Sequence, residues 1–212
     1  IQDMTDYYTL WAHQIKTPIA AMRLLLQEEP RPELEGELLK IEQYVEMVLG
    51  YLRLGSDSTD YVFRDCDLDS LIRQSVRKYA RLFILKKISL YFQATGKTVL
   101  TDGKWLSFVI EQLLSNAVKY TPEGGGVRIY GDGETLVIAD SGIGIQPEDL
   151  PRVFEKGFTG FNGREDKKST GIGLYLCRQV LDRLNHDISI SSRPGQGTLV
   201  RLDLSRRKRE VE

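Results

Sequence analysis

A run of apolar residues spaced alternately by four and three positions constrains the fold of this 212-residue chain more than any other feature. The run consists of Leu34, Leu38, Ile41, Val45, Val48 and Leu52. This spacing places the six side chains along one seam of an α-helix, which is the pattern that helices of coiled coils and four-helix bundles need. We therefore expect a helix that buries this seam against other helices.

A second amphipathic helix is expected between Met4 and Gln27, where apolar residues again recur at spacings of three and four. These residues are Tyr8, Trp11, Ile15, Ile19, Met22 and Leu26. The two prolines at positions 30 and 32 separate the helices, because proline fixes φ and lacks an N–H donor. Two helices bury two apolar faces poorly, so the pattern favours a homodimer that forms a four-helix bundle. The alternative is a hairpin that packs on the rest of the chain.

The pattern changes to mixed α/β after a polar, turn-rich stretch at residues 55–60. We predict a helical hairpin over residues 1–55, a linker over 56–66 and an α/β domain over 67–212. In that domain, Asp67 is expected to cap a helix that runs to about Leu85. Further helices are predicted at 104–120 and 172–184, and strands near 90–92, 99–100, 127–130, 136–139, 188–191 and 199–204.

The charge balance argues against a general nucleic-acid binder. Lysine plus arginine number 29 and aspartate plus glutamate number 30, whereas nucleic-acid binders usually carry a basic excess. Cys66 and Cys177 lie far apart without metal-ligand spacing, so we expect reduced thiols packed in a cytosolic protein. The chain opens at Ile1 inside an expected helix, which indicates a fragment. His186, at a predicted helix-to-strand turn, is expected at the surface.

Three glycine-bearing segments in the α/β domain indicate a ligand. Asp140–Ile145 follows a predicted strand, Ser169–Leu174 opens a helix, and Gly195–Thr198 lies between strands. Glycine permits positive φ and close backbone approach to a ligand. At the start of a helix, free N–H groups and the helix dipole form an anion site suited to phosphates. A single such segment is weak evidence, because tight turns produce many.

The predicted helix 104–120 carries polar residues on one face. Gln112, Asn116 and Lys119 are spaced by four and three, among apolar neighbours. Such polar groups are costly to bury unless they meet a ligand or partner. The amide oxygen of Asn116 can coordinate Mg²⁺, and Lys119 can neutralise phosphate. The alternative is an ordinary amphipathic helix whose polar side faces water.

In this order, the motifs from about Asp67 to Leu204 resemble the ATP-binding domain of sensor histidine kinases, within the GHKL ATPase superfamily. The resemblance implies an α/β sandwich that binds ATP and Mg²⁺. It implies that Asn116 and Gln112 hold Mg²⁺, although many members have asparagine where Gln112 stands, and that Asp140 accepts a hydrogen bond from the adenine amine. The other nucleotide-binding residues that it implies are Lys119, Tyr120, Gly142, Gly144, Phe158, Gly171, Gly173, Leu174 and Thr198.

The stretch Thr159–Lys168 lacks apolar periodicity and carries a cluster of charges. We expect it to be mobile without ligand and to order over ATP. Arg164, Lys167 and Lys168 are candidate phosphate contacts, or members of a solvated loop. Phe154 and Phe158 before it resemble the phenylalanine box of the family.

The first predicted helix contains His13-Gln14-Ile15-Lys16-Thr17-Pro18. Pro18 is expected to bend the helix one turn beyond His13. The segment resembles the phosphoacceptor box of histidine kinases, which implies that His13 is the nucleophile and that Thr17 positions water for dephosphorylation of the partner. Gln14 stands where most relatives have an acid. Its carbonyl oxygen can accept the imidazole N–H, but it cannot act as a base.

Together the resemblances imply the cytoplasmic core of a sensor histidine kinase. ATP would phosphorylate His13, and an aspartate in the receiver domain of a response regulator would then take the phosphoryl group. The wording of the histidine box resembles a Gram-positive, envelope-stress subgroup with short sensor regions, whose members are anchored in the membrane through a preceding segment. Two alternatives remain: a serine kinase or ATPase of the same superfamily, and a scaffold that binds ATP without turnover.

Overall fold

The computed structural model describes residues 2–29, 31–54, 61–160 and 171–205, and of residues 2–13, 32 and 33 only the backbone. The chain divides into two compact units, Ile1–Asp60 and Tyr61–Glu212. Residues 56–60 of the expected linker and residues 161–168 of the stretch expected to order over ATP, which include Arg164, Lys167 and Lys168, lie outside the described residues. None of the described helices is long and apolar enough to span a membrane.

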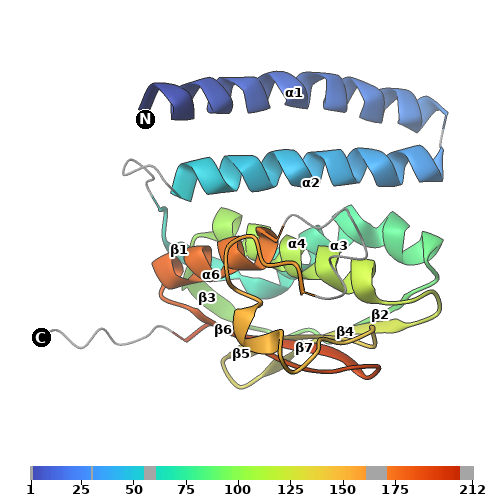
Figure 1. Ribbon diagram of the computed structural model, residues 1–212, viewed down its shortest axis with the longest axis vertical. Helices are drawn as coiled ribbons and strands as arrows, with labels where there is room; N and C mark the ends of the chain where they lie inside the picture. Colours follow the sequence, from blue (N-terminus) through green and yellow to red (C-terminus); the bar gives the residue numbers. More distant parts are fainter. Residues whose placement is uncertain (1, 30, 55–60, 161–170, 206–212) are drawn as a thin grey trace, which may run out of the picture. The chain divides into compact units, whose positions relative to one another are not determined.

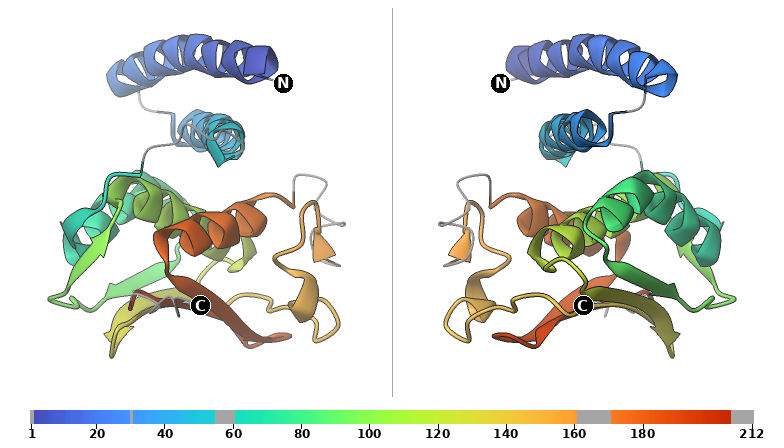
Figure 2. Two further views of the ribbon diagram at one scale, coloured as in Figure 1. Left: turned by 90° about the vertical axis from the view of Figure 1, so that its left-hand side faces the viewer. Right: turned by 90° about the vertical axis from the view of Figure 1, so that its right-hand side faces the viewer.

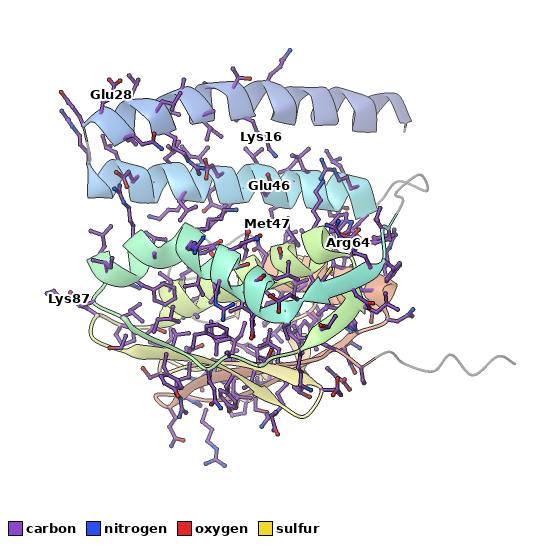
Figure 3. All side chains as sticks on the ribbon, turned by 180° about the vertical axis from the view of Figure 1, so that it is seen from behind. Lys16, Glu28, Glu46, Met47, Arg64 and Lys87 are labelled. Carbon is purple, nitrogen blue, oxygen red and sulfur yellow. The ribbon has the colours of Figure 1, made fainter. Side chains whose placement is uncertain are left out.

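The first unit contains the two expected helices, α1 (Gln2–Glu28) and α2 (Pro32–Leu54) (Figure 1). The α1 helix continues through Pro18. A small core of Ile19, Leu38, Val45 and Leu49 joins the two helices, with Ile15 and Leu26 packed against it. Two ion pairs, Lys16–Glu46 and Arg23–Glu42, also link the helices. Figure 3 shows Lys16 and Glu46 between α1 and α2.

The predicted seam of α2 divides into two rows. Leu38 and Val45 are buried, whereas Leu34, Ile41 and Val48 are 51%, 43% and 40% exposed. The division follows from helix geometry: residues seven positions apart share a row, and neighbouring rows point in different directions. On α1, Met22 is also exposed, in contrast to the expected buried face. The chain therefore keeps one apolar row of α2 accessible.

The second unit is an α/β domain built on a mixed sheet of five strands in the order β2-β4-β5-β7-β6. Strands β2 and β4 are parallel, and the other pairs are antiparallel. The strands are β2 (Ser89–Phe92), β4 (Gly126–Asp132), β5 (Thr135–Asp140), β6 (Asp187–Arg193) and β7 (Gly197–Asp203). A separate antiparallel pair consists of β1 (Arg64–Asp67) and β3 (Thr98–Thr101).

Helices α3 (Leu68–Leu85), α4 (Gly103–Tyr120) and α6 (Gly173–Leu184) cover one face of the five-stranded sheet (Figure 2). A short 3₁₀-helix, η1, spans Leu150–Arg152. The core between these layers is apolar, because the helix faces and the inner face of the sheet both exclude water. Its fully buried side chains include Ile72, Leu106, Ile110, Leu114, Ile129, Leu136, Leu176, Leu181 and Leu202.

Aspartates begin two of the helices. Asp67 caps α3, as expected, and its side chain accepts the N–H of Ser70 at 3.2 Å. Asp102 caps α4 by accepting the N–H groups of Lys104 and Trp105 at 2.9 and 3.2 Å. These bonds pair backbone donors that the first turn of a helix leaves open.

The surface position predicted for His186 is wrong. The side chain is fully buried, and its Nε2 lies 3.1 Å from Thr101 Oγ1. Asn185 ends α6 in the left-handed conformation, with φ of 59°, and the chain then enters β6 with the imidazole inside the domain. Cys66 and Cys177 are buried free thiols, which confirms their expected packing role.

Three residues expected in the linker, at positions 64–66, are part of strand β1. The strand contains four residues, and only Cys66 among them is buried. A strand this short, with polar residues at its exposed positions, lacks the apolar alternation by which strands are detected in a sequence.

Candidate functional site

A row of polar side chains crosses three neighbouring strands at one end of the sheet. Asp140 of β5 is paired with Thr198 of β7, which in turn is paired with Ser192 of β6. Directly paired residues project from the same face of a sheet. Asp140 Oδ1 accepts the N–H groups of Gly142 and Thr198 at 2.8 and 3.2 Å. Among the described residues, both bonds end on the same oxygen, so Oδ2 can accept from a ligand.

The carboxyl group of Asp140 has an unusual environment. Burial raises its pKa above the ordinary value, although the N–H groups of Gly142 and Thr198 act in the opposite direction. A partly buried carboxylate with an open oxygen is a strong acceptor, because a less polar surrounding strengthens its hydrogen bonds. The position therefore suits a ligand that donates an N–H.

The loop after β5 is held between α4 and the β6–β7 turn. The Ile143 N–H donates to the Tyr120 carbonyl at 3.1 Å, and the Ile143 carbonyl accepts the Gly195 N–H at 2.8 Å. This close approach requires glycine at two positions. A Cβ at Gly142 would lie 2.7 Å from the Tyr120 oxygen, and one at Gly144 would lie 2.1 Å from the Arg193 oxygen. The loop thus places Gly142 and Gly144 beside the end of α4.

The predicted polar face of α4 is partly buried. Gln112 is 6% exposed, and its Oε1 faces the start of α6, where a Cβ at Gly173 would lie 3.1 Å away. Asn116 and Lys119 are half-buried, and the Lys119 ammonium lies 5.1 Å from the ring centre of Tyr120. The described residues contain no group of three or more His, Cys, Asp or Glu side chains arranged for a metal. An amide oxygen such as that of Asn116 fits Mg²⁺ that takes its other ligands from phosphate and water.

The start of α6 is hydrogen-bonded to the segment that contains Phe154 and Phe158. The Gly157 N–H donates to the Gly171 carbonyl at 2.9 Å, and Gly171 has φ of +65°. A Cβ there would lie 2.5 Å from the backbone of Gly157, so glycine is required. Phe158 lies under the Arg152 guanidinium, at 4.4 Å from the ring centre. Gly173 and Leu174 then form the first turn of α6, whose N–H groups suit an anion.

The sequence did not indicate two residues that position parts of the site, Ser192 and Lys86. The Lys86 ammonium, at the end of α3, donates to the carbonyls of Val118, Lys119 and Thr121 at 2.5, 3.3 and 2.9 Å. These carbonyls end α4, where a cation is favourable because of the helix dipole. The Tyr120 carbonyl between them holds the glycine loop, so Lys86 supports that loop indirectly.

Replacing Lys86 by methionine is expected to weaken ligand binding at the loop by about tenfold and to lower stability by about 2 kcal/mol, since charge-assisted bonds are lost. Lys86→Arg should restore most of both. Calorimetric titration and urea denaturation measure the two effects. The matched control is Lys87→Met, because Lys87, labelled in Figure 3, forms an exposed ion pair with Glu123. Equal effects at both lysines would contradict the role of Lys86.

The candidates of the first unit lie on α1. Gln14 and Thr17 are exposed, and the side chain of His13 lies outside the described residues.

Comparison with known proteins identifies the second unit. Residues 101–208, more than half of the 212-residue chain, match the model of the family described as histidine kinase-, DNA gyrase B-, and HSP90-like ATPases. The chain belongs to this ATPase family. The matched segment contains α4, the Gly142–Gly144 loop, the start of α6, and the polar row of Asp140, Thr198 and Ser192.

The chain is also similar to curated sensor proteins. The chain is 36% identical to the sensor histidine kinase YxdK of Bacillus subtilis over 204 residues, which cover 92% of this chain and 63% of YxdK. It is 37% identical to the sensor protein BceS of Halalkalibacterium halodurans over 206 residues, which cover 93% of this chain and 61% of BceS. The chain therefore spans about three fifths of the length of these curated relatives.

The fold also occurs in a solved structure, full-length ShkA in complex with AMPPNP. The TM-score is 0.65 at 23% sequence identity, over 93% of this chain and 45% of ShkA. The predicted α/β architecture, with a mixed sheet, is thereby confirmed as a fold that this chain shares with ShkA.

Proposed function

We propose that the chain is the catalytic core of a sensor histidine kinase. ATP phosphorylates His13, and the phosphoryl group then passes to an aspartate of a response regulator. The observation that carries this proposal is the union, in one chain, of the His13 box on α1 with an ATPase domain of this family. The likeness to named sensor kinases extends over both parts, because it covers more than nine tenths of the chain.

The second unit is proposed to bind ATP along the polar row of Asp140, Thr198 and Ser192, beside the Gly142–Gly144 loop and the start of α6. Asp140 Oδ2 accepts the exocyclic amine of adenine, while Oδ1 stays bound to Gly142 and Thr198. Lys119 and the first turn of α6, at Gly173, contact the phosphates. Asn116, with Gln112 beside it on α4, holds Mg²⁺, which would neutralise charge on the phosphates.

The proposed reaction is an in-line phosphoryl transfer. A lone pair on a neutral imidazole nitrogen of His13 forms the new N–P bond to the γ-phosphorus. The bond from that phosphorus to the β–γ bridging oxygen breaks, and ADP leaves with both electrons of that bond. Gln14 can orient the ring by accepting its other N–H, and Thr17, one turn further along α1, can position water for removal of phosphate from the regulator.

The exposed row on α2 supports a homodimer. Leu34, Ile41 and Val48 are seven residues apart, and the exposed Tyr44 and Tyr51 follow Ile41 and Val48 by three residues on the same face. A second copy of the chain would cover these side chains and complete a four-helix bundle. The intact protein is proposed to be membrane-anchored, with this core in the cytoplasm, as in the envelope-stress subgroup that the histidine box resembles.

Gln14→Glu is expected to speed autophosphorylation about tenfold, because a carboxylate can hold the imidazole proton that an amide only accepts as a hydrogen bond. The initial rate of labelling from ATP measures the effect. Gln27→Glu adds the same charge at an exposed position of the same helix and should leave the rate unchanged. A rate for Gln14→Glu at or below that of the wild type would contradict the idea that Gln14 limits the rate of autophosphorylation.

Incubation with Mg²⁺ and ATP labelled on the γ-phosphate tests the function itself. We expect label on the wild type and none on His13→Ala or Asn116→Ala. Tight ATP binding without any label would instead favour the scaffold that binds ATP without turnover. Label that survives His13→Ala would show that another residue is the acceptor.

A further inference from the structure

The hydroxyl group of Ser192 is saturated with hydrogen bonds. Its oxygen accepts the Ile145 N–H at 2.9 Å, donates to the Gly197 carbonyl at 2.7 Å and lies 3.0 Å from Thr198 Oγ1. A serine hydroxyl has one proton to donate and two lone pairs that accept. These three contacts therefore use every hydrogen-bonding position of the group.

This saturation determines the direction of the bond to Thr198. The Gly197 carbonyl can only accept, so the Ser192 proton must point at it. The Ile145 N–H can only donate, so it takes one lone pair of Ser192. The contact with Thr198 remains, and the proton in it must come from the Thr198 hydroxyl.

Thr198 consequently offers a ligand only lone pairs. Its side chain shares a face of the sheet with that of Asp140, to which it is directly paired. The Asp140 carboxylate is also an acceptor without a proton. A base placed against this row meets acceptors from both residues. Adenine presents an amine donor at its six-position, whereas guanine presents a carbonyl acceptor there.

We propose that Ser192 is a positioning residue for nucleotide selection. By holding the proton of the Thr198 hydroxyl, it turns Thr198 into an acceptor that matches the amine of adenine and rejects the carbonyl of guanine. This inference rests on the proposed binding of ATP at Asp140. Guanine is rejected because its carbonyl would face the Thr198 oxygen away from water, and neither acceptor would then have a hydrogen-bond donor.

The test compares the affinities of the chain for AMPPNP and GMPPNP with Mg²⁺ by calorimetric titration. In Ser192→Ala, the Thr198 hydroxyl can turn and donate to the guanine carbonyl, so the preference for AMPPNP over GMPPNP should fall by about tenfold. Ser192→Thr, which keeps the hydroxyl, should retain the preference. Ser191→Ala is the matched control, because Ser191 is the next residue of β6 and projects from the opposite face.

Use of the affinity ratio separates positioning from a general loss of structure. Loss of the bond to Ile145 affects both nucleotides alike and cancels in the ratio. With Thr198→Val already present, Ser192→Ala should change the ratio no further. An unchanged ratio in Ser192→Ala, with tight AMPPNP binding, would overturn the inference and leave the proposed function intact. Failure of the wild type to bind AMPPNP would overturn both.

Discussion

Asp140→Asn is expected to weaken ATP binding about a hundredfold while the folded domain stays at least as stable as the wild type. The reason lies in the two N–H groups, of Gly142 and Thr198, that meet one oxygen of the side chain. In the variant, the amide oxygen must stay with these donors, so the NH₂ group takes the other position. An amine donor of adenine would then face another donor.

The stability of Asp140→Asn follows from the raised pKa of Asp140. Folding favours the protonated form of this carboxyl group, so the folded state is relatively most stable below the unfolded pKa. That advantage is lost as the pH rises through the folded pKa. At pH 7 the wild type therefore carries a destabilising carboxylate that the neutral amide lacks. We expect the Tm of the variant to rise by about 2 °C at pH 7 and not at pH 3.

The same raised pKa predicts the pH dependence of ligand binding. Protonation of Asp140 replaces an acceptor by a donor, so ATP affinity should fall with decreasing pH at a higher pH than an ordinary aspartate would give. Titration calorimetry over an acidic pH series measures this fall. Asp132→Asn, at the exposed end of β4, is the control and should change neither affinity nor Tm. Unchanged affinity in Asp140→Asn would refute the assigned contact.

Gly197→Ala should lower the free energy of unfolding by about 3 kcal/mol or more, because an overlap with backbone has no flexible side chain to relieve it. Gly197 has φ of +96°, and a Cβ there would lie 1.9 Å from the Asp140 carbonyl oxygen. The variant would have to separate β5 from β7 at the point where Asp140 and Thr198 are paired. Nucleotide binding should therefore be lost together with stability.

Gly195→Ala is the matched control for this substitution. Gly195 also has positive φ, of +74°, but no atom lies within 4 Å of the added Cβ. It should cost only the backbone strain, about 1 kcal/mol. Urea denaturation of both variants separates the two contributions. Similar losses at the two glycines would mean that conformational strain, rather than the contact with Asp140, explains the requirement.

The elements of the site that follow local rules could be predicted from the sequence. The polar face of α4, the Gly142–Gly144 loop and the start of α6 are patterns that lie within a few residues of sequence. The structure places Tyr120, Gly142 and Gly144 together. Likewise, Asp67 correctly predicted the start of α3.

The interactions that the sequence could not reveal connect distant parts of the chain. Lys86 meets carbonyls 32 to 35 positions further along, and no local pattern marks such a partner. Ser192 contacts Ile145 across 47 positions, and both Ser192 and Thr198, with which it is paired, lie just outside the strands predicted from the sequence. The burial of His186 depends on Thr101, 85 positions away. Such contacts depend on how the strands and helices pack, which periodicity does not encode.

The location and chemistry of the phosphoryl group test the central claim most directly. After incubation with ATP and Mg²⁺, the chain would be digested at alkaline pH and its phosphopeptides identified by mass spectrometry. We predict phosphate on the imidazole of His13, stable to alkali and lost in acid, and absent from Asn116→Ala. Phosphate that withstands acid on a serine or threonine, with His13 unmodified, would contradict the assignment and favour a serine kinase.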